Sequence, residues 1–343
     1  PILLYHVLGD AVSASDVSSS IVQSLNSENP ESVVEVSDMG VMLNGSAKVI
    51  ATDIVGTNGI IHVIDQVILP IDNGSILDAA MGLEDFSSLV AALAKANLAS
   101  TFMMEGEYTV FAPTNDAFAS FLSSLGVSFE DLTAEDLAPI LFYHVIGAKA
   151  MSGSLETGYI NTLYEAIEGY PVSMLVEVED GVKLNGNVMV TAADVETSNG
   201  VIHVIDAVLT PTSTVDIAIN NSNFTYLVEA VVKADLVETL SAPGPFTIFA
   251  PTNAAFEQLF TDLGVSGIEE IAKETLVSVL QYHVVSGNIL STDLTEASVS
   301  TLNGEVIFSL SHGVTINGNS EVIATDIQGT NGVIHVIDRV LLP

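Results

Sequence analysis

VIATDIVGTNGIIHVIDQVILP, at residues 49–70, reveals the architecture of the chain, because similar segments occur at two further places. Residues 322–343 read VIATDIQGTNGVIHVIDRVLLP and differ from it at four of 22 positions. A third copy, VTAADVETSNGVIHVIDAVLTP, occupies residues 190–211. Recurrence at a regular spacing is the signature of a repeated structural unit. The spacing of about 130 to 140 residues is that of a domain, not of a solenoid repeat.

A second block occurs only twice, as YTVFAPTNDAFASFL at 108–122 and FTIFAPTNAAFEQLF at 246–260. The sequence therefore predicts two complete domains, residues 71–211 and 212–343, preceded by the C-terminal half of a domain at residues 1–70 whose N-terminal half is missing. We expect the missing N-terminal half to lie upstream of Pro1. It should contain a TVFAPT-like block about 30 positions before Pro1, with a leader peptide further back.

Charge and composition exclude several classes of partner. The chain carries 43 acidic against 7 basic residues, a net charge of −36, so it repels nucleic acid and anionic membrane surfaces. It contains no cysteine, which excludes disulfides, thiolate nucleophiles and zinc knuckles. No apolar run reaches the roughly 18 residues needed for a transmembrane segment in this stretch.

The first half of each unit shows helical periodicity. Apolar residues spaced i, i+3, i+4, i+7 predict amphipathic helices. A helix after Thr114, a good N-cap, should bury its apolar positions, and another should end near Gly147 with His144 on its apolar face and Tyr143 pointing elsewhere. The positions predicted to be buried in the first of these helices along the chain are Phe86, Leu89, Val90 and Leu93. In the helix after Thr114 they are Phe118, Phe121, Leu122 and Leu125, with the counterparts Phe256, Leu259, Phe260 and Leu263. In the helix before Gly147 they are Leu137, Ile140 and Leu141.

The second half of each unit changes to a period of two. Turn signals at Asp180-Gly181 and Asn185-Gly186 predict hairpins, and the Asn-Gly pair returns at 44–45 and 317–318. The closing segment VIHVIDAVLTP at 201–211 is apolar on both faces, so we expect a central, doubly buried strand. Helices followed by strands favour an α+β domain.

At these residues the sequence resembles the fasciclin-domain family. TVFAPTNDAF at 109–118 matches one family signature, and TIFAPTNAAF at 247–256 matches it with one change. NGVIHVID with the following residues, at 199–209 and 331–341, matches the other signature, as does 58–68 with Ile for Val. The resemblance implies tandem domains, each a wedge of mixed β-strands with packed helices. It also implies cell adhesion or matrix contact by secreted or anchored proteins, and hence an extracellular or cell-surface location.

Some members of this family use the Tyr-His region in binding integrins. Carried over, the resemblance indicates six candidate partner-contact residues, Tyr5, His6, Tyr143, His144, Tyr282 and His283. The competing interpretation is that His144 and His203 are core histidines whose ring nitrogens are satisfied by neighbouring groups. Nothing in the sequence decides the identity of a partner, and no RGD motif is present.

No catalytic pattern emerges. GxSxG, HExxH and P-loop motifs are absent, and His203 and Asp206 should point to opposite faces of a strand. Glu177, Glu179 and Asp180 surround a hairpin turn, where a solvated surface is expected in place of a metal site. The sequence therefore predicts no enzyme, cofactor or metal centre.

Four Asn-x-Ser/Thr sequons are candidate N-glycosylation sites in a secreted eukaryotic protein: Asn44, Asn73, Asn220 and Asn223. Asn44 lies in a tight hairpin, and Asn220 and Asn223 are close neighbours, which argues against full occupancy.

The leading hypothesis is a non-enzymatic extracellular adhesion or scaffolding protein that binds a protein or polysaccharide, or itself, through domain surfaces. One alternative is an accessory subunit on the extracellular or organelle-lumenal side of a large membrane or filament assembly. Another is a small-ligand carrier, which would need an apolar cavity of several hundred Å³.

Overall fold

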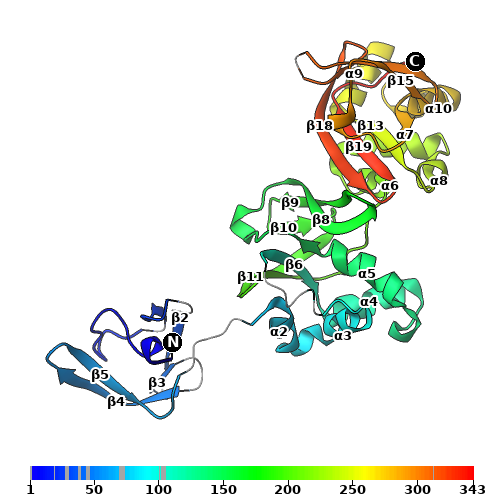
Figure 1. Ribbon diagram of the computed structural model, residues 1–343. Coiled ribbons are helices and arrows are strands. Elements are labelled where there is room, and N and C mark those ends of the chain that lie inside the picture. Colours follow the sequence, from blue (N-terminus) through cyan, green and yellow to red (C-terminus); the bar gives the residue numbers. More distant parts are fainter. Residues whose placement is uncertain are drawn as a thin grey trace. The chain divides into compact units, whose positions relative to one another are not determined.

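A computed structural model describes residues 2–18, 20–27, 31–37, 40–43, 47–68, 74–99, 101, 106–311 and 313–343. The chain divides into two compact units, residues 1–74 and 75–343 (Figure 1). We call residues 1–70, 71–211 and 212–343 the first, second and third repeats. Mixed sheets with packed helices confirm the predicted α+β class.

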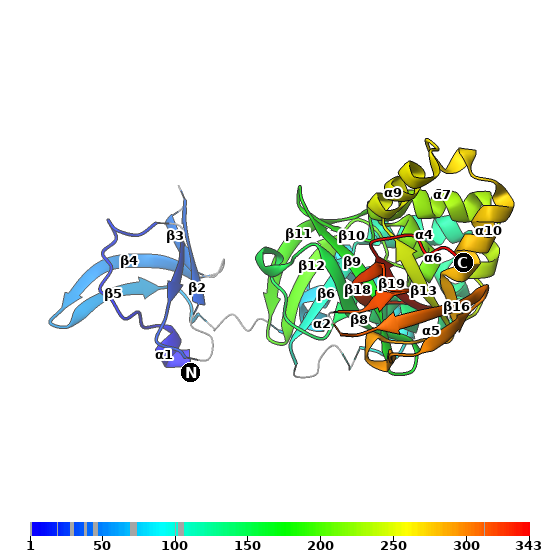
Figure 2. The same ribbon diagram turned by 90° about the horizontal axis from the view of Figure 1, so that it is seen from above.

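The first repeat forms one antiparallel sheet in the strand order β1-β2-β3-β4-β5, with a short helix at its start (Figure 2). Tyr5 of that helix is buried against Ala47 and Ile68. Its elements are α1 (Ile2–Tyr5), β1 (Ser20–Gln23), β2 (Glu31–Ser37), β3 (Gly40–Leu43), β4 (Ala47–Gly56) and β5 (Gly59–Ile64).

The second repeat contains a seven-stranded mixed sheet in the order β7-β6-β12-β11-β10-β9-β8. Its helices are α2 (Ile76–Met81), α3 (Ser87–Lys95), α4 (Asn115–Leu125) and α5 (Ala134–Tyr143), with 3-10 turns η1 (Glu84–Phe86), η3 (Phe129–Asp131) and η4 (Ser152–Ser154). Its strands are β6 (Tyr108–Pro113), β7 (Val145–Ile146), β8 (Gly158–Ile167), β9 (Tyr170–Val178), β10 (Val182–Leu184), β11 (Val188–Thr197) and β12 (Gly200–Ile205).

The third repeat has the same topology, β14-β13-β19-β18-β17-β16-β15. Its helices are α6 (Thr214–Ile219), α7 (Thr225–Lys233), α8 (Val237–Leu240), α9 (Asn253–Leu263) and α10 (Lys273–Tyr282), with turns η5 (Ser222–Phe224), η6 (Ile268–Glu270) and η7 (Ser291–Asp293). Its strands are β13 (Phe246–Pro251), β14 (Val284–Ser286), β15 (Ser298–Thr301), β16 (Gly304–Ser309), β17 (Thr315–Ile316), β18 (Ser320–Gly329) and β19 (Gly332–Ile337).

The parallel pair at the centre of each complete repeat separates two apolar cores. On β6, Val110 and Ala112 face the helices, while Phe111 faces the β9–β10 side of the wedge. On β12, Ile202 and Ile205 divide in the same way. This two-sided burial confirms the predicted central strand, and it explains why TVFA and VIHVI are apolar almost without interruption.

The sequence prediction is wrong at the ends of three helices. Leu125 and Leu263 are exposed, because each lies in the last turn of its helix, just before a left-handed glycine cap. Helix α5 ends at Tyr143 and not near Gly147, because Val145–Ile146 leaves the helix to pair with β6. Thr114 does cap α4, and the turns after β9 and β10 fall at the predicted Asp-Gly and Asn-Gly pairs. The pair at 44–45 lies outside the described residues.

Among the described residues of the first repeat, β5 is an edge strand, whereas its counterparts β12 and β19 are central. Ile61 is 60% exposed, while Ile202 at the same repeat position is 1% exposed. Leu3 of α1 is 85% exposed and its counterpart Leu141 is 2% exposed. The positions that form the helix-side core of a complete repeat are therefore uncovered in the first.

Candidate functional site

The histidine of each Tyr-His pair joins the end of a helix to the chain that follows the closing strand. The Nδ1 atom of His144 lies 2.7 Å from the carbonyl oxygen of Ile140, and its Nε2 atom lies 2.9 Å from the backbone nitrogen of Leu209. A carbonyl only accepts and a backbone N–H only donates, so the proton of this imidazole is on Nδ1. Both ring nitrogens are thereby satisfied inside the protein.

The same pattern recurs in the other repeats. His283 donates to the carbonyl oxygen of Val279 at 2.8 Å and accepts from the backbone N–H of Leu341 at 2.9 Å. His6 makes the equivalent contacts, but its side chain is exposed. Burial disfavours the charged imidazolium and lowers the pKa of both His144 and His283 to about 4.

In the second and third repeats the tyrosine of the pair points to the other core, as predicted, and its hydroxyl anchors the Asn-Gly turn. The Tyr143 hydroxyl donates to the carbonyl oxygen of Ser173 at 3.0 Å and accepts from the Nδ2 atom of Asn185 at 2.9 Å. Asn185 adopts a left-handed conformation with φ 46°, which asparagine tolerates better than most residues. Tyr282 repeats this arrangement with Asn317.

The candidate partner-contact residues are therefore placed differently in the repeats. Tyr143, His144, Tyr282 and His283 are buried, and so is Tyr5, which leaves His6 as the exposed member of the six. Four of them lie inside closed repeats and are held by hydrogen bonds to backbone or amide groups. Direct contact between a partner and these four side chains would require a repeat to open.

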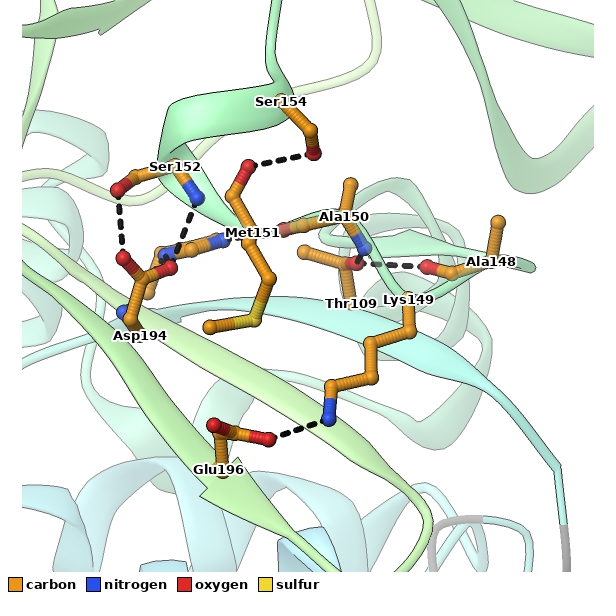
Figure 3. A network of polar contacts seen from close by, with 10 residues as sticks. Thr109, Ala148, Lys149, Ala150, Met151, Ser152, Ser154, Asp194 and Glu196 are labelled. Atoms are coloured by element: carbon orange, nitrogen blue, oxygen red, sulfur yellow. Dashed lines mark hydrogen bonds and ion pairs between the residues drawn. The ribbon is translucent and has the colours of Figure 1, made fainter.

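A polar network around a β-bulge occupies the other recurring histidine position (Figure 3). Asp194 sits at a register shift between β11 and β12 with φ 63°. Its carboxylate accepts from the backbone N–H of Ser152 at 2.7 Å and from the Ser152 hydroxyl at 2.6 Å. These hydrogen bonds lower the pKa of Asp194 below the usual aspartate value.

His203 lies beneath this bulge and is fixed in one tautomer. The backbone N–H of Asp194 donates to its Nδ1 atom at 3.2 Å, so the proton is on Nε2, which donates to the carbonyl oxygen of Ala150 at 2.8 Å. Because Nδ1 is an acceptor here, the Asp194 carboxylate 3.9 Å away does not form an ion pair with it. The Thr109 hydroxyl completes the network by bonding the backbone at Ala148 and Ala150.

The third repeat reproduces the network with Asp326, Ser291, His335 and Thr247. In the first repeat, Asp53 accepts from the backbone N–H of Ala14, and His62 contacts the carbonyl oxygen of Val12. The pattern thus ties a loop to the closing hairpin in every copy. Sequence reasoning missed this aspartate, although its recurrence at the same position in all three copies is a signal that could have identified it.

In the two complete repeats, the tyrosines and histidines of these sites hold structure. The four buried histidines donate to and accept from backbone atoms, so neither nitrogen is available as a general base. His203 and Asp206 have different hydrogen-bond partners, since Asp206 accepts from the backbone N–H of Met189. Within the described part of the chain, no three His, Asp or Glu side chains gather into a metal site.

Two small apolar cavities lie between helices and sheet at equivalent places. The one in the third repeat is about 50 Å³, bounded by Leu227, Val231, Leu280 and Ile334, and its counterpart in the second repeat is about 10 Å³. Both are far below the several hundred Å³ that a small-ligand carrier needs. The carrier hypothesis therefore finds no support at these cavities.

The structure describes two of the four candidate glycosylation sites. Asn223 lies exposed in η5, and Asn220 is the half-buried C-cap residue of α6. Asn44 and Asn73 lie outside the described residues.

The repeated wedge, its central parallel pair and the recurring Tyr-His and bulge-aspartate sites define one domain class, present in tandem. The sequence model of the Fasciclin domain matches residues 1–70, 84–211 and 222–343. The chain therefore belongs to the fasciclin domain family.

Relatives of this chain occur in animals and bacteria. Human periostin is 29% identical over 89% of this chain and 35% of its own length. Rabbit transforming growth factor-beta-induced protein ig-h3 is 29% identical over 98% of this chain and 48% of its own length. Protein sll1483 of Synechocystis is 45% identical over 38% of this chain and 72% of its own length. This chain thus spans between a third and a half of the two animal proteins.

A solved FAS1 domain pair from the insect cell adhesion molecule Fasciclin I is 20% identical, with a TM-score of 0.43 over 74% of this chain and 92% of that chain. Within the residues described here, no helix combines the length and apolar character needed to cross a bilayer.

The bulge aspartate yields a local prediction. Replacing Asp194 with asparagine keeps the left-handed backbone accessible but removes the charged acceptor of two Ser152 hydrogen bonds. Because the carboxylate is partly exposed, we expect the loop 148–154 to lose about 1 kcal/mol of protection, or roughly a fivefold faster amide exchange. Hydrogen–deuterium exchange followed by mass spectrometry would measure it. Asp206→Asn, at the other end of the hairpin, is the control, and equal exchange in both variants would contradict the assignment.

Proposed function

We propose that this chain is part of a non-enzymatic adhesion or scaffolding protein, located outside the cell or at its surface, that binds through the faces of its fasciclin domains. The main support is that the recurring histidines of the complete repeats form hydrogen bonds inside the protein with both ring nitrogens. His144, His203, His283 and His335 all bond backbone atoms through both ring nitrogens. What remains for a partner is surface.

Membership of the family supports the proposal, since periostin and the ig-h3 protein are built from the same domain. The net charge of −36 narrows the partner class. A strongly anionic chain is repelled by sulfated or uronic polysaccharides at low salt, so a protein surface, a neutral polysaccharide or a second copy fits better. If the protein passes through a glycosylating pathway, exposed Asn223 is a more accessible acceptor than half-buried Asn220.

The full chain, immobilised and folded, should bind at least one member of a panel comprising collagen, fibronectin, cellulose, dextran and the chain itself. The binding should survive about 0.15 M salt, because its main source is surface complementarity and not long-range charge. Heparin is the matched anionic control and should not bind. Failure to bind every member of the panel, or hydrolysis of any of them, would count against the proposal.

A further inference from the structure

The second and third repeats meet through a set of specific, buried contacts. Tyr159 extends from β8 of the second repeat and packs against the apolar helix-side core of the third. Its hydroxyl accepts from the Nδ2 atom of Asn221 at 2.9 Å. Burial raises the pKa of Tyr159 to about 12, as expected for a phenol shielded from water at this contact.

A second contact joins the two sheets. The backbone N–H of Gln328 on β18 donates to the hydroxyl of Ser173 on β9 at 3.0 Å, and Ser173 donates in turn to Asn161. Both Ser173 and Gln328 are almost completely buried, so water does not compete for this bond. Losing such a bond would leave a buried N–H unpaired, which is costly.

The Tyr-His pair of the second repeat contributes a third contact, to the linker. The Tyr143 hydroxyl lies 3.2 Å from the hydroxyl of Thr212. Since the Tyr143 proton is used by the carbonyl of Ser173, Thr212 is the donor. The carbonyl oxygen of Thr212 then accepts from the backbone N–H of Thr330, between β18 and β19.

Glycine permits the closest approach at this joint. A Cβ atom on Gly186, in the Asn-Gly turn of the second repeat, would lie 2.5 Å from the carbonyl oxygen of Asn220 at the end of α6. Gly318 occupies the same turn in the third repeat with nearly the same φ, 70° against 76°, and a Cβ there would meet nothing within 4 Å. The closeness at Gly186 is thus a property of the joint and not of the turn.

The sequence also differs between repeats where the joint needs it. Gln328 is one of the four positions at which residues 322–343 depart from residues 49–70, where the counterpart is Val55. Val55 is 77% exposed, while Gln328 is 3% exposed and uses its amide to bond Asn288 and the backbone of Gly329 and Gly332. The linker residue Thr212 corresponds to Ile71, which has no hydroxyl to offer a tyrosine.

From these contacts we infer that the second and third repeats are held in one fixed orientation and act as a single preorganised binding platform, with Tyr143 serving as a positioning residue of the joint. A partner that touches both repeats would then pay no entropy for ordering the linker. The joint is fixed before any partner binds.

The test uses the full chain, which has no native cysteine, so two spin labels can be placed at will. Ser124→Cys on α4 and Glu257→Cys on α9 are exposed positions on corresponding helices of the two repeats. Pulsed electron–electron double resonance between the two labels should give one narrow distance distribution. A broad or multimodal distribution in the labelled parent would overturn the inference at once.

Gly186→Ala and Gly318→Ala form the matched pair of variants. Both add the same methyl group to a left-handed glycine of an Asn-Gly turn, so both carry similar backbone strain. Only Gly186→Ala should shift the label distance or at least double the width of its distribution. Equal behaviour of the two variants would refute a fixed joint.

Ser173→Ala supplies a second measurement that does not depend on added bulk. Its expected effect is at least tenfold faster exchange of the Gln328 amide, with β12 and β19 amides unchanged, which shows that both repeats stay folded. Ser154→Ala, an exposed serine away from the joint, is the control. An unchanged Gln328 amide in Ser173→Ala would exclude the joint contact, whatever the label distances show.

Discussion

Replacing Gly332 with alanine is expected to destabilise the third repeat by about 4 kcal/mol. Gly332 begins the central strand β19 opposite Phe246 of β13, with φ 154°. A Cβ atom there would lie 2.0 Å from the carbonyl oxygen of Phe246, a backbone atom that cannot move without breaking the parallel pair. The change therefore adds a steric overlap to a backbone conformation that L side chains rarely adopt.

Calorimetry or urea unfolding of the full chain would measure this loss, which corresponds to a fall of about 10 °C in Tm for a unit of this size. Gly200→Ala in β12 should behave alike, since its Cβ would lie 2.1 Å from the carbonyl oxygen of Tyr108.

Gly59→Ala is the internal control, because a Cβ there meets nothing within 4 Å and β5 lacks a parallel neighbour among the described residues. We expect its effect to stay within about 0.5 kcal/mol. If Gly59→Ala and Gly332→Ala cost the same, close parallel pairing is not what demands glycine.

Acidification from pH 6.5 to 4 is expected to remove about 3 kcal/mol of stability for each of His144 and His283. Burial holds the pKa of each histidine at about 4 in the folded protein, whereas an unfolded histidine titrates near 6.5. As the pH falls from 6.5 to 4, each histidine becomes protonated in the unfolded chain but stays largely neutral in the folded chain, so the unfolded state is favoured. The contribution is therefore complete above pH 6.5 and disappears progressively toward pH 4.

Carboxylates affect the same curve but can be separated from it. Hydrogen bonds from Ser128, Thr133 and Ser152 lower the pKa of Asp131, Asp136 and Asp194, so their stabilising effect is lost only at lower pH. Protonating other acids relieves the repulsion of a chain with net charge −36, which acts in the opposite direction. Comparison with a variant that lacks the histidine removes these shared contributions.

Urea unfolding of the parent and of His283→Gln at several pH values between 4 and 7 is the measurement. The variant should be less stable at pH 7, because the hydrogen bonds to Val279 and Leu341 are disturbed. Between the two pKa values, the free energy of unfolding should fall less steeply with acid in the variant than in the parent. We expect the two slopes to differ by about 1.4 kcal/mol per pH unit. Parallel curves for the parent and His283→Gln would show that His283 is not neutral in the folded state.

Local sequence predicted the fold well where one short segment carries the whole signal. VIHVI is apolar on both faces, and this pattern correctly predicted that β12 and β19 lie inside their sheets. Helix ends were less predictable, since Leu125 continues the apolar spacing but lies in a last turn that has no neighbour to cover it. Periodicity reports the direction of a side chain, not whether another element lies in front of it.

The candidate site was harder to predict because its partners are far apart in sequence. The Tyr-His pairs were located from their recurrence, but the Tyr143 hydroxyl bonds a turn 42 residues away and a linker residue 69 away. Asp194 meets Ser152 only because a bulge turns its backbone left-handed, and such a bulge leaves no trace in an alternating pattern. Recurrence marked the positions that matter, whereas their contacts required the folded chain.

Gln328 also bears on how the chain avoids folding incorrectly. Hairpins β4–β5 and β18–β19 are nearly identical in sequence, so during refolding either hairpin could pair into the sheet of the other repeat. An exchanged hairpin would bring Val55 to the place of Gln328 and forfeit the amide's bonds to Asn288, Gly329 and Gly332. Gln328 is thus one of four differences between two almost interchangeable segments, and the loss of its hydrogen bonds disfavours the swapped arrangement.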